Sequence, residues 1–143
     1  MPHLVILYTP QLDQETEMGV LCRALANTML AARDAAGDAV FPPGGTRVLA
    51  FPAAHYAVAD DGSAGRAAGG TGDYAFVYLQ LRMASGRSSP THTRIGNALM
   101  QTTRAHFADM FDTRHIGITL QIDEGTPVFD AKHSNLHPLF AQT

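Results

Sequence analysis

The sequence predicts a single α/β domain of the α+β type, in which two β-α-β units form a four-stranded mixed sheet with two helices on one face. Three observations predict this fold. A chain of 143 residues has a usual length for one domain, so residues 1–143 are taken as one unit. Hydrophobic residues make up 45%, as expected of a packed globular chain. Finally, the pattern strand–helix–strand occurs twice, with a glycine-rich connector between the two occurrences.

The first unit begins with His3 to Tyr8, a short and almost wholly apolar run that is typical of a strand buried on both faces. Asp13 is suited to cap the helix that follows, and Gly37 is suited to stop it. Apolar residues recur at helical spacing between them: Met18, Leu21, Cys22, Leu25 and Met29. A loop rich in proline and glycine (41–45) then leads into a second strand, Thr46 to Phe51.

The second unit follows the connector Asp60 to Gly72, whose glycine, alanine and aspartate content predicts an exposed segment with scope for motion. Asp73 to Met83 has the alternation of a strand. Its two faces are Ala75, Val77, Leu79, Leu81 and Met83 on one side, and Phe76, Tyr78, Gln80 and Arg82 on the other. Ser89 and Pro90 mark the start of a long amphipathic helix, and alternation over residues 116–123 predicts the last strand. The tail, 126–140, is irregular, with a short helical turn near its end.

The predicted arrangement leaves the sheet face opposite the helices without cover from the same chain. We expect apolar side chains on that face, and burial of apolar surface is worth about 25 cal/mol per Å². An uncovered apolar face of this kind favours self-association. The sequence therefore predicts an oligomer.

The charge and composition narrow the class of partner. A formal net charge of -3 gives no sign of the basic face that nucleic-acid binding needs. Neither an apolar run of about 20 residues nor a secretory signal pattern is visible, so no membrane partner is expected. The single cysteine, Cys22, cannot form an internal disulfide and falls on the apolar stripe of the first helix. These features predict a cytoplasmic protein.

Pro2 is the first candidate for catalysis. Initiator methionine is generally removed before a small residue, and removal of Met1 would leave Pro2 with a free secondary amine. An α-amino group titrates at about 7.7–8.0 in model peptides, and burial or nearby cations favour its neutral form. A neutral amine near its pKa is suited to proton transfer. The alternative is that proline simply follows methionine here, as it often does.

Two arginines are candidates for binding a small carboxylate. Arg47 begins a predicted strand after the 41–46 loop, and Arg87 follows Gly86 at the end of another. The guanidinium group matches a carboxylate through paired hydrogen bonds, and strand ends leave room for a pocket. The alternative for each is an ordinary solvated surface residue.

The histidines do not predict a metal site. His133 and His137 are four residues apart, but no third ligand accompanies them at a recognisable spacing, so we expect no metal. His106 lies on or beside the apolar stripe of the long helix and is expected to be packed. His3 could either tune the Pro2 amine or pack within the sheet, and the residues leave both open.

Five segments together resemble one family. They are Pro2-His3, FPPGGTR (41–47), GDYAFVYLQL (72–81), SGRS (85–88) and HSNLHPLF (133–140). In their order and approximate spacing, over nearly the whole chain, they resemble the 5-carboxymethyl-2-hydroxymuconate isomerases of the tautomerase superfamily. The DYAFV strand followed by GRS is the most specific of these elements.

The resemblance implies a homotrimeric isomerase with no metal and no organic cofactor. Its substrate would be a carboxylated 2-hydroxymuconate, formed when bacteria degrade the aromatic compound homoprotocatechuate, and its product the conjugated 2-oxo isomer. Pro2 falls at the family's catalytic proline, the general acid and base. Arg47 and Arg87 fall at arginines that hold substrate carboxylates and polarise the enol oxygen.

The sequence departs from the family pattern at three places, and these bear on the identity of the substrate more than on the type of reaction. Leu49 stands where relatives carry a second arginine, the segment Leu7 to Gln11 is more apolar, and the connector 55–72 is longer. Two alternatives therefore remain at this point. One is a tautomerase-like enzyme for another enol or unsaturated acid, and the other is a non-catalytic trimer that binds a small acid.

Overall fold

A computed structural model describes residues 2–141, and Met1, Gln142 and Thr143 lie outside the described residues. Four strands form one sheet: β1 (His3–Tyr8), β2 (Arg47–Pro52), β3 (Ala75–Met83) and β4 (Ile116–Glu124). Their order is β2-β1-β3-β4. β1 is parallel to β2 and β3 is parallel to β4, whereas the central strands β1 and β3 are antiparallel. The predicted mixed sheet of two β-α-β units is confirmed.

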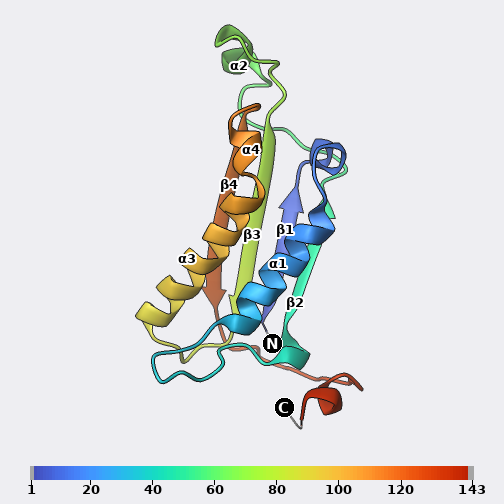
Figure 1. Cartoon of the computed structure of the whole chain (residues 1–143). Helices are drawn as coiled ribbons and strands as arrows, with labels where there is room; N and C mark the ends of the chain where they lie inside the picture. Colours follow the sequence, from blue (N-terminus) through green and yellow to red (C-terminus); the bar gives the residue numbers. More distant parts are fainter. Residues whose placement is uncertain (1, 142–143) are drawn as a thin grey trace.

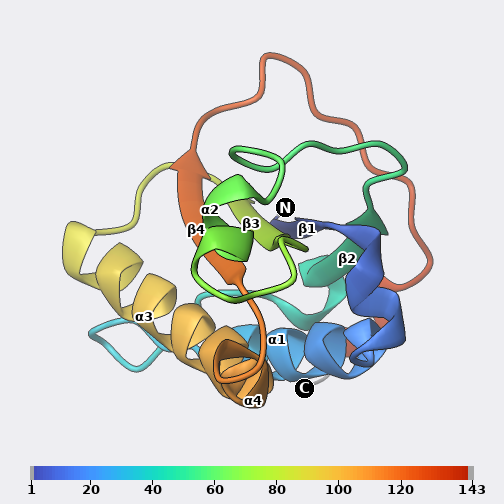
Figure 2. The same ribbon diagram turned by 90° about the horizontal axis from the view of Figure 1, so that it is seen from above.

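Two long helices, α1 (Met18–Ala31) and α3 (Ser89–His106), cover the same face of the sheet (Figures 1 and 2). α3 begins where predicted, because the Ser88 hydroxyl accepts the backbone N–H of Thr91 at 3.3 Å and Pro90 lies in the first turn. The short helix α4 (Ala108–Phe111) follows α3. Within residues 2–141, no helix has the length and apolar character needed to span a bilayer.

The predicted ends of α1 were wrong. Glu17 precedes the helix, and Asp13 instead lies in the 3-10 helix η1 (Pro10–Gln14), where its carboxylate accepts the Tyr8 hydroxyl at 2.6 Å. Because the Asp13 carboxylate bonds Tyr8 of β1, Asp13 does not cap α1. At the other end α1 stops at Ala31, well before Gly37. Gly37 (φ +87°) lies in a separate turn of the loop.

The hydrophobic core fills the space between the sheet and the two helices. Its fully buried members include Leu4, Ile6, Leu21, Leu25, Met29, Val77, Leu79, Leu81 and Phe107. The predicted alternation of β3 is confirmed. The prediction that β1 is buried on both faces is wrong for the single chain, since His3 and Leu7 are exposed while Leu4 and Ile6 are buried. The reason is that α1 and α3 cover only one face.

The opposite side of the sheet, called here the open face, has an apolar half and a polar half. On β1 and β2, Leu7, Leu49 and Phe51 are 46%, 48% and 49% exposed. On β3 and β4, polar pairs bridge the strands: Tyr78 donates to Gln121 at 2.7 Å, and Gln80 donates to Asp123 at 2.6 Å. The expectation of an apolar open face therefore holds for β1 and β2 only.

The connector Asp60 to Gly72 is more ordered than predicted and contains the short helix α2 (Ser63–Ala67), which projects beyond one end of the sheet (Figure 1). The Asp60 carboxylate accepts the backbone N–H groups of Gly62 at 3.1 Å and Ala64 at 2.9 Å. The Tyr74 hydroxyl accepts the N–H of Gly65 at 2.8 Å. These bonds come from single side chains, which a search for periodicity does not detect.

The C-terminal segment, residues 125–140, leaves β4 on the open-face side and runs round the sheet to the edge formed by β2 (Figure 2). It ends in the 3-10 helix η3 (His137–Phe140), which confirms the predicted turn. η3 packs on η2 (Pro43–Gly45) so closely that a Cβ on Gly44 would lie 3.2 Å from the His137 ring. Two side chains of the segment, Val128 and Phe129, are almost wholly exposed.

Candidate active site

The pairing of β1 with both of its neighbours places three basic side chains in one row. His3 is the register partner of Arg47 on β2 and of Arg82 on β3. Directly paired residues project from the same face with Cα atoms about 4.5–5.5 Å apart. Because His3 is exposed on the open face, Arg47 and Arg82 flank it there.

Pro2 immediately precedes this row and is buried, although its neighbour His3 is exposed. The strand that starts at His3 fixes the position of Pro2, which a frayed chain end would not do. Burial of an amine at this position would favour its neutral form. Met1, whose removal frees that amine, lies outside the described residues.

Arg47 is half-buried, and its Nη1 donates to the carbonyl of Gly45 in η2 at 3.2 Å. The proline- and glycine-rich loop therefore does more than connect two elements, since its 3-10 turn orients the arginine that begins β2. Arg47 also acts on its neighbour. The pKa of His3 is lowered, first by partial desolvation of its ring and then by the Arg47 guanidinium. Both effects favour the neutral imidazole.

Arg87 is held in a different way. Its Nη2 donates to the carbonyl of Val40 at 2.8 Å, and its Nη1 donates to the carbonyl of Ala84 at 3.3 Å. These two bonds tie the turn after β3 to the loop between α1 and β2. Among the described residues, no strand pairing or hydrogen bond joins Arg87 to Pro2 or Arg47. The structure thus places Arg47 beside His3, the residue after Pro2, and places Arg87 beyond the end of β3.

A pocket of about 280 Å³ opens beside His3. This volume is at the small end of the range for ligand pockets. One wall comes from the sheet, through His3, Arg82, Met83 and Ala84, and the other from the C-terminal segment, through Gly125, Pro127, Asp130, Ala131 and Lys132. The segment after β4 therefore closes a cavity next to the start of β1.

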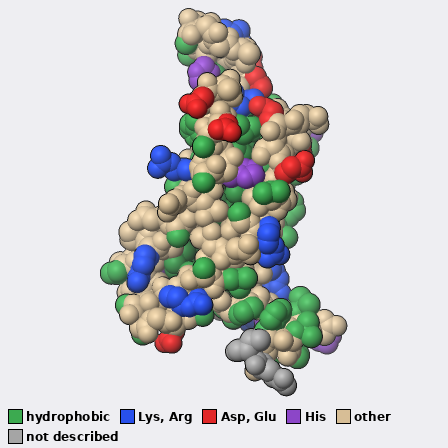
Figure 3. Space-filling view, in the orientation of Figure 1, with side chains coloured by type: hydrophobic (Ala, Val, Ile, Leu, Met, Phe, Trp, Pro, Cys, Tyr) green, Lys and Arg blue, Asp and Glu red, His purple; other side chains and the backbone are tan. Residues whose placement is uncertain are grey.

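Charged side chains of both signs occur at this end of the molecule. On the helix side of the molecule, Lys and Arg prevail in the half where β1 begins, and most of the visible acidic side chains lie nearer α2 (Figure 3). In the pocket, Lys132 is paired with Asp130, and this contact lowers the pKa of the Asp130 carboxyl. Arg82 has no hydrogen bond or ion pair with any residue between 2 and 141.

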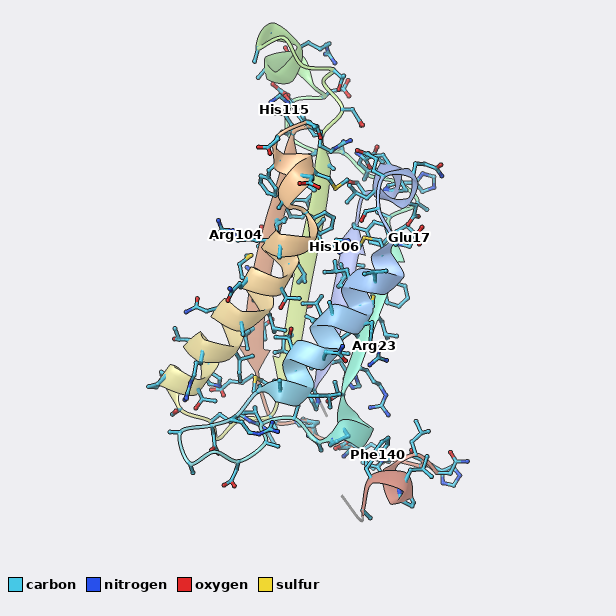
Figure 4. The ribbon with its side chains drawn as sticks, viewed as in Figure 1. Glu17, Arg23, Arg104, His106, His115 and Phe140 are labelled. Carbon is cyan, nitrogen blue, oxygen red and sulfur yellow. The ribbon has the colours of Figure 1, made fainter. Side chains whose placement is uncertain are left out.

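The other sequence candidates lie away from this pocket. His106 is on the side of α3 that faces α1 (Figure 4), where its Nε2 is 2.8 Å from the Thr16 hydroxyl and burial lowers its pKa. This confirms His106 as a packed residue. Cys22 is half-buried against the core rather than within it. Within the part of the chain that is described, no group of three or more His, Cys, Asp or Glu side chains could hold a metal.

Sequence reasoning missed two features of the pocket. It placed Arg82 on one face of its strand but did not connect it with His3, because the antiparallel pairing of β1 with β3 joins residues nearly 80 positions apart. It also took the tail as irregular, with no role in a site. The alternation of β3 was the one signal that could have brought Arg82 into consideration.

Comparison with known proteins identifies the family. The family model for 5-carboxymethyl-2-hydroxymuconate isomerase matches residues 2–140. The chain belongs to the 5-carboxymethyl-2-hydroxymuconate isomerase family. A curated relative, the 5-carboxymethyl-2-hydroxymuconate Delta-isomerase of Escherichia coli, is 28% identical over 140 residues, which are 98% of this chain and 99% of that protein.

Two solved structures support the same conclusion. A crystal structure of a 5-carboxymethyl-2-hydroxymuconate delta-isomerase is 56% identical, with a TM-score of 0.95 over 98% of this chain and 93% of that chain. A 5-carboxymethyl-2-hydroxymuconate isomerase from Deinococcus radiodurans R1 is 29% identical, with a TM-score of 0.78 over 97% of this chain and 93% of that chain. The predicted family, the tautomerase-like fold and the isomerase class are confirmed.

Proposed function

We propose that this isomerase converts 5-carboxymethyl-2-hydroxymuconate into its 2-oxo isomer, with the amine of Pro2 as general base and then general acid. The observation that carries the proposal is the position of Pro2, buried at the start of β1 and next to a residue flanked by two arginines. The names of the relatives supply the substrate, and its carboxylates match the two arginines that flank His3, Arg47 and Arg82.

The reaction moves one proton. Neutral Pro2 accepts the proton of the 2-hydroxyl, so that its O–H bond breaks and a dienolate forms. Protonated Pro2 then delivers that proton to carbon 5, where a C–H bond forms as the C2 oxygen becomes a carbonyl. Atoms and electrons balance without an oxidant, a metal or an organic cofactor, and none is proposed.

Arg47 and Arg87 are proposed to hold substrate carboxylates and to stabilise the dienolate charge. Fixed cations of this kind contribute several kcal/mol to a transition state in which negative charge develops (about 3–4 kcal/mol per group). Arg47 would also lower the pKa of the Pro2 amine, because a nearby positive charge disfavours its protonated form.

The working enzyme is proposed to be a cytoplasmic homotrimer. The open face supports self-association, because Leu7, Leu49 and Phe51 are each about half exposed in the single chain and lie on adjoining strands. Cover from neighbouring chains would bury this apolar half and would enclose the start of β1. The number of chains is given by the family resemblance and is measurable by light scattering.

Direct assay in deuterated water tests the function. The purified protein should abolish the absorbance of the 2-hydroxymuconate chromophore, and the product should carry one solvent-derived deuterium at carbon 5. Other substrates should be compared as well, because Leu49 stands where the family has a second arginine. The comparison uses a panel of 2-hydroxymuconates and haloacrylates. If one of these is turned over faster than 5-carboxymethyl-2-hydroxymuconate, it replaces 5-carboxymethyl-2-hydroxymuconate as the proposed substrate.

A further inference from the structure

Arg82 is a positive side chain at the candidate site with no partner in the described chain. Arg82 and His3 both line the 280 Å³ pocket. Arg82 on β3 is the register partner of His3 on β1, and His3 directly follows Pro2. Its guanidinium borders Gly125, where a Cβ would lie 3.6 Å from Nη2. The group therefore lies at the point where the sheet and the C-terminal segment meet.

Two acids lie near Arg82, and neither forms an ion pair with it. Asp123 is the register partner of Arg82 on β4, and its Oδ2 accepts the Gln80 amide at 2.6 Å. Asp130, across the pocket, is paired with Lys132. Since no acid within residues 2–141 is paired with Arg82, its N–H groups can bind a carboxylate that enters the pocket.

The proposed substrate has one more carboxylate than the family arginines account for. A muconate has a carboxylate at each end, and the carboxymethyl arm on carbon 5 adds a third. Arg47 and Arg87 can each hold one. We propose that Arg82 binds the carboxylate of the carboxymethyl arm and so determines which muconates the enzyme prefers. This inference rests on the proposed function.

Arg82 fits this role better than the other cation of the pocket. Lys132 is already in contact with Asp130, and a lysine binds as a point charge rather than as a planar fork. Arg82, by contrast, projects from a central strand whose position is fixed by pairing on both sides. From this backbone position, its guanidinium can distinguish a substrate with the arm from one without it.

The test compares two substrates, 5-carboxymethyl-2-hydroxymuconate and 2-hydroxymuconate, which lacks the arm. With Arg82→Gln we expect KM for the three-carboxylate substrate to rise by about 10- to 100-fold, the effect of losing a charge-assisted hydrogen bond. kcat/KM for 2-hydroxymuconate should change by less than about twofold. Arg82→Lys should restore part of the loss. Arg104→Gln, which removes an exposed arginine from the outer side of α3, is the control and should discriminate between the substrates as the wild type does.

The possible outcomes separate the inference from the function. The inference is overturned if the wild type acts on both substrates and Arg82→Gln lowers kcat/KM equally for both. It is also overturned if Arg82→Gln changes kcat/KM for neither substrate. In both cases Arg82 does not bind the carboxymethyl arm. If the wild type acts on neither substrate, the proposed function fails and the inference fails with it. Circular dichroism and light scattering of each variant distinguish a misfolded or dissociated protein from a folded one. If Arg82→Gln does not fold, the same comparison of the two substrates is made with Arg82→Lys.

Discussion

His3 and Arg47 face each other across β1 and β2, and the Arg47 guanidinium is, after burial, the second cause of the lowered pKa of His3. Pro2 is the residue before His3, so the same guanidinium is only one residue further from Pro2 than it is from His3. An electrostatic effect that is evident on His3 should therefore extend to the adjacent amine. This relationship links substrate binding and base activation through one side chain.

Replacement of Arg47 by glutamine should change both the rate and its pH dependence. We expect kcat/KM to fall by about 10²–10³, because one fixed positive charge is lost from the transition state. The acidic limb of the pH profile should move to higher pH, since without the cation the Pro2 amine holds its proton more strongly. Arg104→Gln, on the outer side of α3, is the control and should leave both unchanged (Figure 4). An acidic limb that stays in place would show that Arg47 does not act on the base.

Arg87→Gln should reduce stability as well as activity. The side chain ties the Val40 and Ala84 carbonyls together, so its loss should lower the free energy of unfolding by about 1–3 kcal/mol. Urea unfolding measures this change. Arg104 is exposed, and its replacement should stay within about 0.5 kcal/mol of the wild type. Equal stability of the two variants would mean that the Arg87 bonds contribute nothing to the fold.

His106 predicts a loss of stability in mild acid. Its pKa in the folded protein is below the ordinary value of 6.5 because burial disfavours the charged ring. As the pH falls through 6.5, the unfolded chain binds a proton that the folded chain does not, so stability falls until the folded pKa is passed. His106→Gln should lose less stability between pH 7 and pH 5 than the wild type. Parallel curves for the two proteins would contradict the burial of this ring.

The connector provides a pair of matched glycine variants. Gly62 and Gly69 both have positive φ angles, +84° and +90°. A Cβ on Gly62 would lie 2.3 Å from the Gly72 carbonyl oxygen, whereas a Cβ on Gly69 meets nothing within 4 Å. Gly69→Ala should cost about 1–2 kcal/mol and Gly62→Ala more. Hydrogen exchange of the Gly65 amide, which donates to Tyr74, should accelerate more in Gly62→Ala, and the reverse order would show that the connector is packed differently.

Local patterns in the sequence predicted most of the fold. The alternation in β3, the helical spacing in α1 and the Ser89-Pro90 start of α3 are each determined by neighbouring residues, so they were visible without the structure. The start of α1 was not visible, because Asp13 bonds Tyr8 rather than the helix. The order of α2 depends on Tyr74, a residue outside the connector.

Part of the candidate site was also predicted from the sequence, and part was not. Pro2 and Arg47 were predicted from motifs, and the register of β1 with β2 places Arg47 opposite His3, the residue after Pro2. Arg82 was missed because its proximity to His3 depends on the long-range pairing of β1 with β3. The second wall of the pocket was missed because the path of residues 125–132 is determined by contacts between η3 and η2 at its far end, and by no periodic pattern of its own.

The measurement that tests the central claim most directly compares one chain with its Pro2 amine free and the same chain with that amine capped. The protein would be prepared with Met1 retained and divided, and one half treated with a methionine aminopeptidase, which removes methionine before a small residue and leaves Pro2 first. Intact mass identifies each form. We predict that kcat/KM for 5-carboxymethyl-2-hydroxymuconate is at least about 100-fold higher for the form with free Pro2. Equal activity of the two forms would contradict catalysis by the Pro2 amine.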